Sequence, residues 1–429
     1  MEYLRALSGF IFIVFIAWII SGNKKIINWH LVIGGLFLQL TLGILINLVP
    51  PIAHVFTWMS KFFVKIIGFT EVGTRFLFGN EMIDSFGNTF IMKALPTIIF
   101  FSTLSAGLHY LGWLQKIVYG FAWLMSKTMK LSGAESLSAA GNIFLGQTEA
   151  PLMVRPYIPN MTKSELMCLM SGGMATIAGS VLATYVAFLG GGDLESQTKF
   201  ASFLLMASVM NAPAAIVMAK IIIPETETEK LDSNLNINSD KAGVNLIDAL
   251  ARGAADGLKL ALNVGAMLLA FIAVIAALNF ILKDVIGAYT GLNALIISST
   301  DGVFDGFSME YLLGNVFRFF AYLIGVDWHE TLQVGSLLGK KIVVNEFVAY
   351  LDLAAMKDSG LLSQKSILIS TFALCGFANF SSIAIQIGGI GGMAPKRQGD
   401  ISRLGIRALI AGTLASMLTA TLASVLVQV

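Results

Sequence analysis

Two short stretches of this chain place acidic residues between long apolar runs. The first centres on Glu149, and its polar or helix-breaking neighbours are Gly146, Gln147, Thr148 and Pro151. An ionised carboxylate inside a bilayer costs about 3 kcal/mol on insertion scales. Glycine and proline favour a break in the helix, and the backbone groups freed there need partners from protein or from a water-filled cavity. The pattern predicts the tip of a re-entrant hairpin facing a polar cavity, with a cytoplasmic loop as the alternative.

The run before Glu149 is too short to cross a membrane. Residues 136–148 are uncharged, but this run has only 13 residues, whereas a transmembrane helix takes about 20. A helix that enters the bilayer here must turn back, which favours the hairpin over the loop.

The second stretch, residues 345–350, centres on Glu346. The polar residues of the two stretches and of the run at 375–382 suit a neutral solute that is rich in hydroxyl and amide groups. Glu149 and Glu346 accept hydrogen bonds when they are ionised. No lysine or arginine lies within the two tips, which argues against an anionic substrate such as a dicarboxylate. Phe377 could offer the solute an aromatic face or simply pack against its neighbours. Four further side chains can both donate and accept hydrogen bonds: Gln147, Thr148, Asn379 and Ser382.

Positive charge near the tips could come from lysine side chains or from a bound metal ion. The nearest basic residues, Lys340 and Lys341, are expected to pair with Glu330 or to extend toward the membrane surface rather than to touch the solute. Asn142 and Thr176 offer oxygen atoms close to the interrupted helices, whose unwound carbonyls could complete a site for a hard cation such as Na⁺. Hydrogen bonding within the bundle is the alternative role for these two side chains.

The composition is that of a membrane protein. Of the 429 residues, 56% are hydrophobic and only 13% are charged, whereas a soluble domain carries about 25% charged residues. The net charge of +2 favours no particular partner, and nothing in the sequence suggests nucleic-acid binding. Cys168 and Cys375 lie in apolar runs and are expected to pack as small hydrophobic side chains.

Uncharged runs predict an all-α polytopic fold with about eight transmembrane helices and two re-entrant hairpins. Residues 57–67 show helical spacing of polar and aromatic side chains, which is typical of an amphipathic helix in the membrane interface or of a short surface linker. The distribution of lysine and arginine places both chain termini outside the cell. The expected spans are residues 6–23, a second within 26–60 that ends at the Pro50-Pro51 pair, 94–115, 166–192, 200–219, 260–282, 366–395 and 408–429.

The two halves of the chain repeat one order of elements. The tip with Glu149 precedes a long run that contains residues 171–179, and the stretch 345–350 precedes a run that contains 375–382. Buried carboxylates, interrupted helices and a two-fold internal pattern are typical of inverted-repeat secondary transporters, which bind their solute near the membrane midplane. The alternative is a coincidence between two glycine-rich membrane helices.

Enzymes and passive channels are the two functional classes that compete with a transporter. The four histidines are scattered, and neither His-Glu-x-x-His nor Gly-x-Ser-x-Gly occurs. A membrane-embedded hydrolase or transferase is therefore disfavoured. A passive channel is disfavoured only by the asymmetry of the polar tips.

Four motifs carry a resemblance to a known family. They are Gly-Gln-Thr-Glu-Ala-Pro at 146–151, Ser-Gly-Gly-Met-Ala-Thr-Ile-Ala-Gly at 171–179, Asn-Glu-Phe-Val-Ala-Tyr at 345–350 and Cys-Gly-Phe-Ala-Asn-Phe-Ser-Ser at 375–382. With these motifs in order, the chain closely resembles the concentrative nucleoside transporters in their eight-span bacterial form. The resemblance implies a homotrimer in the inner membrane that imports nucleosides such as uridine with a sodium gradient.

The resemblance also implies a division of the chain. Residues 1–115 would form scaffold helices with an interfacial helix, and 225–300 a linker and a further scaffold span. The moving transport domain would comprise a first repeat at 116–224 and a second at 301–429.

The resemblance assigns the site residue by residue. The base would meet Gln147, Thr148, Glu149 and Val181, and the ribose would meet Glu346, Asn379 and Ser382 with Phe377 beside them. Sodium would be held by the side chains of Asn142 and Thr176 and by the carbonyls of Leu145 and Ile177. Thr176 stands where serine is common in the family. Proton-coupled members tend to lack the Thr-Glu-Ala-Pro form of the first tip, which favours sodium over the proton-coupled alternative.

Overall fold

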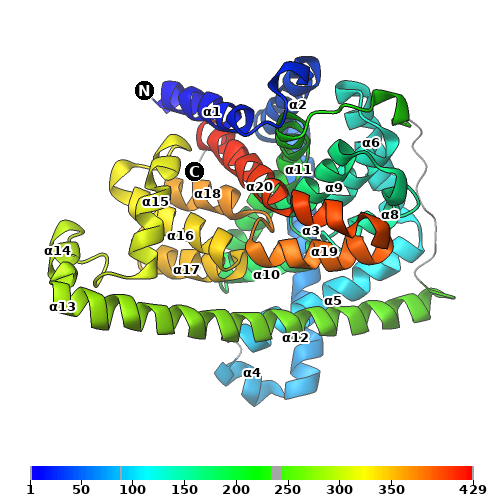
Figure 1. Cartoon of the computed structure of the whole chain (residues 1–429). Helices are drawn as coiled ribbons and strands as arrows, with labels where there is room; N and C mark the ends of the chain where they lie inside the picture. The colour runs from blue at the N-terminus through cyan, green and yellow to red at the C-terminus, as the bar shows by residue number, and fades with distance from the viewer. Residues whose placement is uncertain (1, 87–88, 233–242, 428–429) are drawn as a thin grey trace.

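The computed structural model describes residues 2–86, 89–232 and 243–427. Within these ranges every regular element is a helix, and no strand occurs (Figure 1). Seven of the described helices are long and apolar enough to cross a membrane, or eight if one bent pair counts as a single span. The all-α membrane fold is confirmed, and the number of about eight spans stays a prediction.

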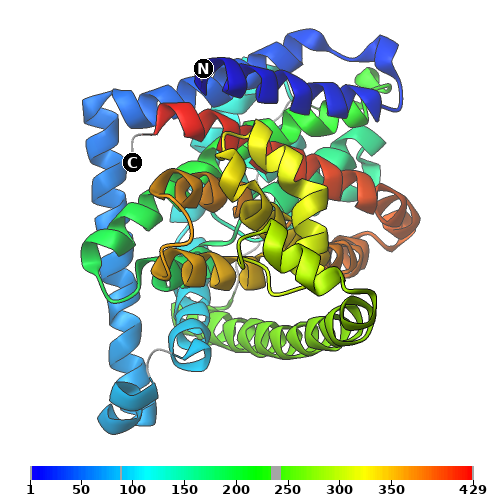
Figure 2. The ribbon, with the colours of Figure 1, turned by 90° about the vertical axis from the view of Figure 1, so that its left-hand side faces the viewer.

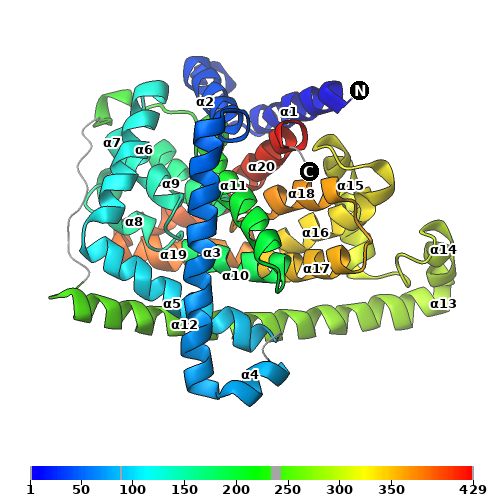
Figure 3. The ribbon, with the colours of Figure 1, turned by 180° about the vertical axis from the view of Figure 1, so that it is seen from behind.

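The first helices form one flank of the molecule. Helix α1 (Glu2–Ile19) is followed by α2 (Trp29–Leu48), α3 (Pro50–Phe78) and α4 (Asn80–Phe86). Proline fits the first turn of a helix because its missing N–H would be unpaired there anyway, so Pro50 and Pro51 begin α3. In Figure 2 the chain turns at this point, and α3 runs down the left edge, crosswise to α2. From behind, α3 crosses in front of α11 (Figure 3).

Two boundaries predicted near this flank are wrong. The amphipathic helix expected at 57–67 is part of the 29-residue helix α3, which is itself apolar and long enough to qualify as a span. The span expected at 94–115 ends earlier, because α5 (Phe90–Tyr110) stops before Gly112, which has a φ of 74°. The chain then bends by 79° into α6 (Trp113–Met129).

A long helix, α12 (Leu246–Asn279), lies along α5. It continues through a π-helical segment, Phe280–Gly287, into α13 (Ala288–Thr290), so the predicted span 260–282 is only its middle part. Gly253 and Gly257 allow the close approach, because a Cβ at either position would lie 2.6 to 2.8 Å from α5 atoms. Small residues four apart are typical of packed membrane helices. Of the segment 225–300, expected to hold a linker and a scaffold span, residues 233–242 lie outside the described ranges.

The two repeats follow the order that the sequence predicts. The first comprises α7 (Gly133–Asn142), α8 (Ala150–Met153), α9 (Lys163–Ala175), α10 (Gly179–Gly190) and α11 (Leu194–Ile222). The second comprises α16 (Thr331–Val343), α17 (Glu346–Asp358), α18 (Gln364–Leu374), α19 (Phe380–Met393) and α20 (Gln398–Leu426). Helices α14 (Leu292–Ser299) and α15 (Met309–Leu323) precede the second repeat. Five 3-10 turns connect elements at Lys24–Ile26, Ile158–Asn160, Thr228–Lys230, Trp328–Glu330 and Pro395–Arg397.

Capping side chains decide where the short helices of the repeats begin. Ser132 and Glu135 form a capping box at the start of α7, and Thr162 and Glu165 form another at the start of α9. In each box the two residues satisfy one another's free backbone N–H groups. Asn345 and Asn379 cap α17 and α19 in the second repeat.

Asn211 on α11 joins the two repeats at the core. Its Nδ2 donates to the carbonyl oxygen of Ala175, where α9 ends, at 2.7 Å. It also donates to the carbonyl oxygen of Cys375, where α18 ends, at 2.9 Å. Both helix breaks are therefore held by one buried amide.

We predict that Asn211→Leu destabilises the protein, because two buried carbonyls lose their donor at a cost of about 1–3 kcal/mol each. The apparent melting temperature in detergent should fall by several degrees. Asn315→Leu is the matched control, since Asn315 is exposed and bonds only to its own helix. Equal melting temperatures for both variants would contradict this role of Asn211.

Candidate functional site

The two tips and the two broken helices meet at a cavity of about 420 Å³, which α12 closes on one side. Each long run is interrupted where glycine and polar residues were found in the sequence, at 176–178 and at 375–379. All eight residues predicted to bind the solute line this cavity: Gln147, Thr148, Glu149, Val181, Glu346, Phe377, Asn379 and Ser382.

Three half-helices begin at the cavity wall. Helix α17 begins at Glu346, α19 begins just after Asn379, and Ser180 is the second residue of α10. The N-terminus of a helix carries a partial positive charge. The cavity therefore combines helix N-termini with two carboxylates and several neutral donors and acceptors, and among the described residues no lysine or arginine lines it, a surrounding that suits a polar, uncharged solute.

Glu346 is held by hydrogen bonds from both repeats. Its Oε1 accepts from the hydroxyl of Tyr185 at 3.1 Å, and its Oε2 accepts from Nδ2 of Asn379 at 2.7 Å. Asn379 is oriented in turn, because its Oδ1 accepts from the backbone N–H of Ser382 at 2.8 Å. The carboxylate is 3% exposed and lines the cavity with a fixed orientation.

Gln147 is oriented by a second chain of hydrogen bonds. Its Nε2 donates to Oγ of Ser382 at 3.0 Å, and its Oε1 accepts from Nε2 of Gln386 at 3.1 Å. Gln386 also donates to the carbonyl oxygen of Met170 at 3.0 Å. Because a carbonyl only accepts, this bond fixes the amide of Gln386 and, through it, the amide of Gln147. Gly173 leaves the necessary room, since a Cβ there would lie 2.9 Å from that of Gln147.

Tyr185 and Gln386 were missed by the sequence reasoning. Each follows a predicted residue by one helical turn, Tyr185 after Val181 and Gln386 after Ser382. Residues four apart share a helix face, so that spacing could have found them. The residues that α12 contributes, Asn263 and Met267 among them, had no such signal.

Thr148 and Glu149 are exposed at the cavity, whereas Gln147 beside them is buried. The first tip therefore offers one fixed amide and two side chains that are accessible from the cavity. This difference within three consecutive residues follows from the short turn that separates α7 from α8.

The residues predicted to hold sodium lie where two helix C-termini meet. Asn142 ends α7, and Thr176 follows the last residue of α9; both side chains are 1% exposed. Neither the Oδ1 nor the Nδ2 of Asn142 has a hydrogen-bond partner. The Thr176 hydroxyl donates to the carbonyl of Gly172 at 2.8 Å, which leaves its lone pairs free to accept. Leu145 and Ile177 lie in the non-helical segments that follow these two helices.

This arrangement fits a small monovalent cation. The C-terminus of a helix carries a partial negative charge that favours cations, and the orphaned amide oxygen of Asn142 is a suitable ligand. Among the described residues no group of three or more His, Cys, Asp or Glu side chains could hold a metal ion. Neutral oxygen donors match an alkali ion better than a transition metal.

The pairing expected for the two lysines is wrong. Lys340 forms ion pairs with Glu310 at 3.0 Å and with Asp352 at 2.5 Å. Lys341 is buried and donates to the carbonyl of Ala373 and to Oγ of Ser416, both at 2.9 Å. The prediction failed because these partners come from sequence-distant helices.

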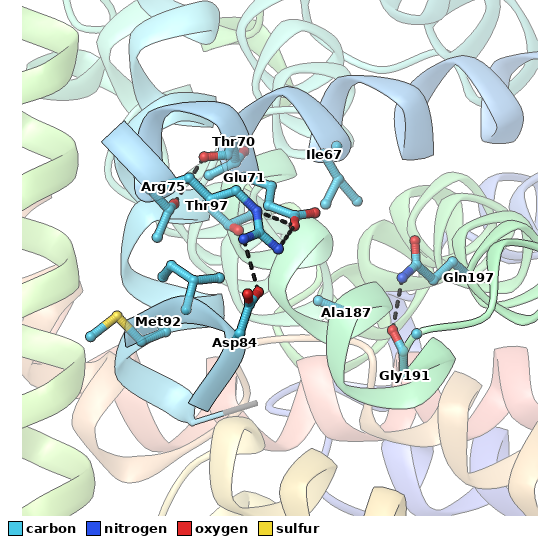
Figure 4. A pocket seen from close by; sticks show the side chains of 14 residues that line it. Ile67, Thr70, Glu71, Arg75, Asp84, Met92, Thr97, Ala187, Gly191 and Gln197 are labelled. Atoms are coloured by element: carbon cyan, nitrogen blue, oxygen red, sulfur yellow. Dashed lines mark hydrogen bonds and ion pairs between the residues drawn. The ribbon is translucent and has the colours of Figure 1, made fainter. Parts of the chain in front are cut away.

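A second cavity, of about 440 Å³, lies between α3, α4 and α5 and the junction of α10 with α11. Figure 4 shows Arg75 pointing toward Glu71 and Asp84, with which it forms ion pairs of 2.8 and 2.9 Å. Gln197 donates to the carbonyl of Gly191 nearby. The charged groups of this second cavity form ion pairs with one another. Among the described residues, its lining includes none from either tip, so the first cavity is the better candidate for the functional site.

Comparisons with known proteins place the chain in a family. Three family models match it: "Na+ dependent nucleoside transporter N-terminus" over 8–81, "Nucleoside recognition" over 91–192 and "Na+ dependent nucleoside transporter C-terminus" over 203–424. The last model alone covers more than half of the chain.

Relatives and solved structures agree with these models. The uncharacterized transporter YutK of Bacillus subtilis is 42% identical over 428 residues, with 100% of both chains covered. Solute carrier family 28 member 3 of Mus musculus is 38% identical over 439 residues, and the match covers 99% of this chain but 59% of the mouse protein. The structure of CNTnw in an inward-facing substrate-bound state superposes with a TM-score of 0.88 at 40% identity, covering 99% of this chain and 98% of that one.

The matched proteins are multi-pass membrane transporters rather than enzymes. Their similarity extends over nearly the whole chain and includes both repeats and the cavity between them. The chain belongs to the family of sodium-dependent, concentrative nucleoside transporters, in which sodium is the coupling ion.

Proposed function

We propose that this chain is a symporter that imports nucleosides such as uridine across the bacterial inner membrane, driven by a sodium gradient. The observation that carries the proposal is the fixed carboxylate of Glu346 in a cavity that also holds the amide of Gln147. A carboxylate can accept from two ribose hydroxyls at once, and an amide can both donate to and accept from the edge of a base.

In this proposal the two halves of the nucleoside meet different repeats. Glu346, Asn379 and Ser382 bind the ribose, with Phe377 beside it. The first repeat binds the base through Gln147, Thr148, Glu149 and Val181. The direct bond between Gln147 and Ser382 supports a shared site, because it joins the base side to the ribose side.

Sodium occupies the space between Asn142, Thr176 and the carbonyls of Leu145 and Ile177. The ion would brace the first tip against the first broken helix, so that Gln147 and Thr148 are in place for the base. The unpaired amide of Asn142 between two helix C-termini supports this assignment. Protons are the alternative coupling ion, for which the accessible carboxylate of Glu149 would be the carrier.

Transport would proceed by movement of one body against another. A buried network unites the first hairpin with α9 and α11: Lys220 is ion-paired with Glu135, and Oγ of Ser132 donates to Glu165 at 2.7 Å. Thr162 also donates to Glu225 just after α11, at 2.7 Å. The bonds from Gln147 to Ser382 and from Tyr185 to Glu346 join the first repeat to the second. Together these contacts support one rigid transport domain, built from residues 116–224 and 301–429.

The scaffold in this proposal comprises residues 1–115 and 225–300 and assembles as a homotrimer. The close packing of α5 on α12 supports a scaffold of its own, and α12 forms the cavity wall past which the tips would move. CNTnw has been solved in inward-facing, outward-facing and intermediate states. The similarity to all of these structures supports alternating access for this chain.

The function is tested by uptake of radiolabelled uridine into proteoliposomes. We expect accumulation with an inward sodium gradient and none when choline replaces sodium. Uptake that persists in choline and follows an imposed pH gradient would favour proton coupling through Glu149. Conversion of uridine to a product without accumulation would overturn the assignment as a transporter.

We predict that Glu346→Gln lowers uridine uptake at least tenfold while the protein stays folded. A hydrogen bond to a charged group contributes about 1.5–3 kcal/mol, and the glutamine amide that replaces the carboxylate carries no charge. Tyr185→Phe should lower uptake less, because it removes one donor but leaves the carboxylate. Glu81→Gln on the exposed helix α4 is the control. If the unmutated protein bound uridine and 2′,3′-dideoxyuridine with equal affinity, Glu346 would not be a ligand of the ribose hydroxyls.

We predict that Asn142→Ala raises the sodium concentration needed for half-maximal uptake severalfold. Nucleoside affinity at saturating sodium should change little, because the variant lacks an ion ligand rather than a solute ligand. By linkage, sodium should tighten uridine binding and uridine should tighten sodium binding by the same factor. Asn315→Ala serves as control. A normal sodium requirement in the Asn142 variant would place the ion elsewhere.

A further inference from the structure

Lys341 is a buried cation that the proposed mechanism does not use. Its side chain is 1% exposed, and its Nζ donates to the carbonyl of Ala373 and to Oγ of Ser416 at 2.9 Å each. Within the described part of the chain, the ion pairs of the second repeat involve Lys340, Lys357, Lys365 and Arg397 and leave Lys341 without a carboxylate partner. A buried ammonium needs compensation from elsewhere.

Helix C-termini provide that compensation. Lys341 lies in the last turn of α16, which ends at Val343, and Ala373 lies in the last turn of α18, which ends at Leu374. Carbonyl groups at the end of a helix carry a partial negative charge and stabilise a nearby cation. The ammonium therefore sits where the two interrupted helices of the second repeat present their negative ends.

The first repeat places a neutral residue at the corresponding position of the chain. The same spacing along the chain separates Asn142 from Lys341, Gln147 from Glu346, and Ala175 at the end of α9 from Leu374 at the end of α18. Asn142 lies between the C-termini of α7 and α9, and its amide has no protein partner. One repeat thus leaves room for a cation at the place where the other carries one on a side chain.

We propose that the Lys341 ammonium is a built-in counterpart of the sodium ion, which braces the second tip against the second broken helix. Lys341 is thus a positioning residue for the ribose half of the site. The inference rests on the proposed function, because it takes the first-repeat position as the sodium site.

Contacts connect Lys341 to the carboxylate that it positions. The ammonium holds α16 to α18 through Ala373, and the hydroxyl of Tyr350 on α17 donates to the carbonyl of Thr371 on α18 at 2.8 Å. Both helices that flank the second tip are therefore fastened to α18. Glu346, the first residue of α17, is placed opposite Asn379, which follows α18.

The arrangement has a consequence for coupling. The ribose half of the site is organised without an ion, because its cation is covalently attached. Only the base half of the site then requires sodium.

The test compares uridine with 2′,3′-dideoxyuridine, which lacks the ribose hydroxyls, in calorimetric binding to the purified full-length protein. Lys341→Met should weaken uridine binding at least tenfold, and additional sodium should not restore it. Binding of dideoxyuridine should change less than threefold, because only the hydroxyl contacts are lost. Lys341→Arg, which keeps the charge, should recover part of the uridine affinity. Asn142→Ala gives the contrast, since high sodium should restore its binding.

Two results would overturn the proposal. Unchanged uridine affinity in Lys341→Met would show that the ammonium positions nothing, and an equal loss for both ligands would show a general structural role. If Lys341→Met does not fold, Ser416→Ala keeps the charge but removes one of its partners, and it should weaken uridine selectively by a smaller factor. Equal loss of both ligands in that variant would likewise reject the idea. Failure of the unmutated protein to bind uridine, or to respond to sodium, would instead refute the proposed function.

Discussion

A helix that ends inside a membrane must find partners for its free backbone groups, and the rest of this structure depends on that constraint. The hydrocarbon region itself holds no water, so each break needs protein groups, an ion or a water-filled cavity. The cavity lies at the N-terminal ends of α10, α17 and α19, and two buried sites lie at the C-terminal ends of α7, α9, α16 and α18. The helix ends at the cavity therefore carry partial positive charge, and those at the two buried positions carry partial negative charge.

The two repeats solve this problem with different chemistry. In the second, the ammonium of Lys341 lies at the helix C-termini, whereas in the first the amide of Asn142 at the corresponding place has no hydrogen-bond partner. Asn211 connects them, because its single amide group donates to the carbonyls at both helix breaks.

The two helix breaks are held in place by the helices packed around them. Hydrogen bonds and ion pairs around Glu135, Glu165 and Lys220 join the first hairpin to the helices behind it. On the other side of the cavity, glycines let α12 approach α5 closely. At the cavity, α12 contributes mostly apolar side chains and Asn263, and the other polar groups belong to the repeats.

The sequence by itself determined the all-α membrane fold, the positions of the helix breaks and the eight polar or apolar residues that line the cavity. These features are local, since a carboxylate beside glycine and proline signals an interrupted helix wherever it packs. The bend at Gly112, the length of α3 and the partners of Lys340 and Lys341 were decided only by the tertiary structure. So was the contribution of α12 to the cavity. Those contacts join residues far apart in the chain, and a hydrogen bond depends on where two helices meet rather than on the pattern within either.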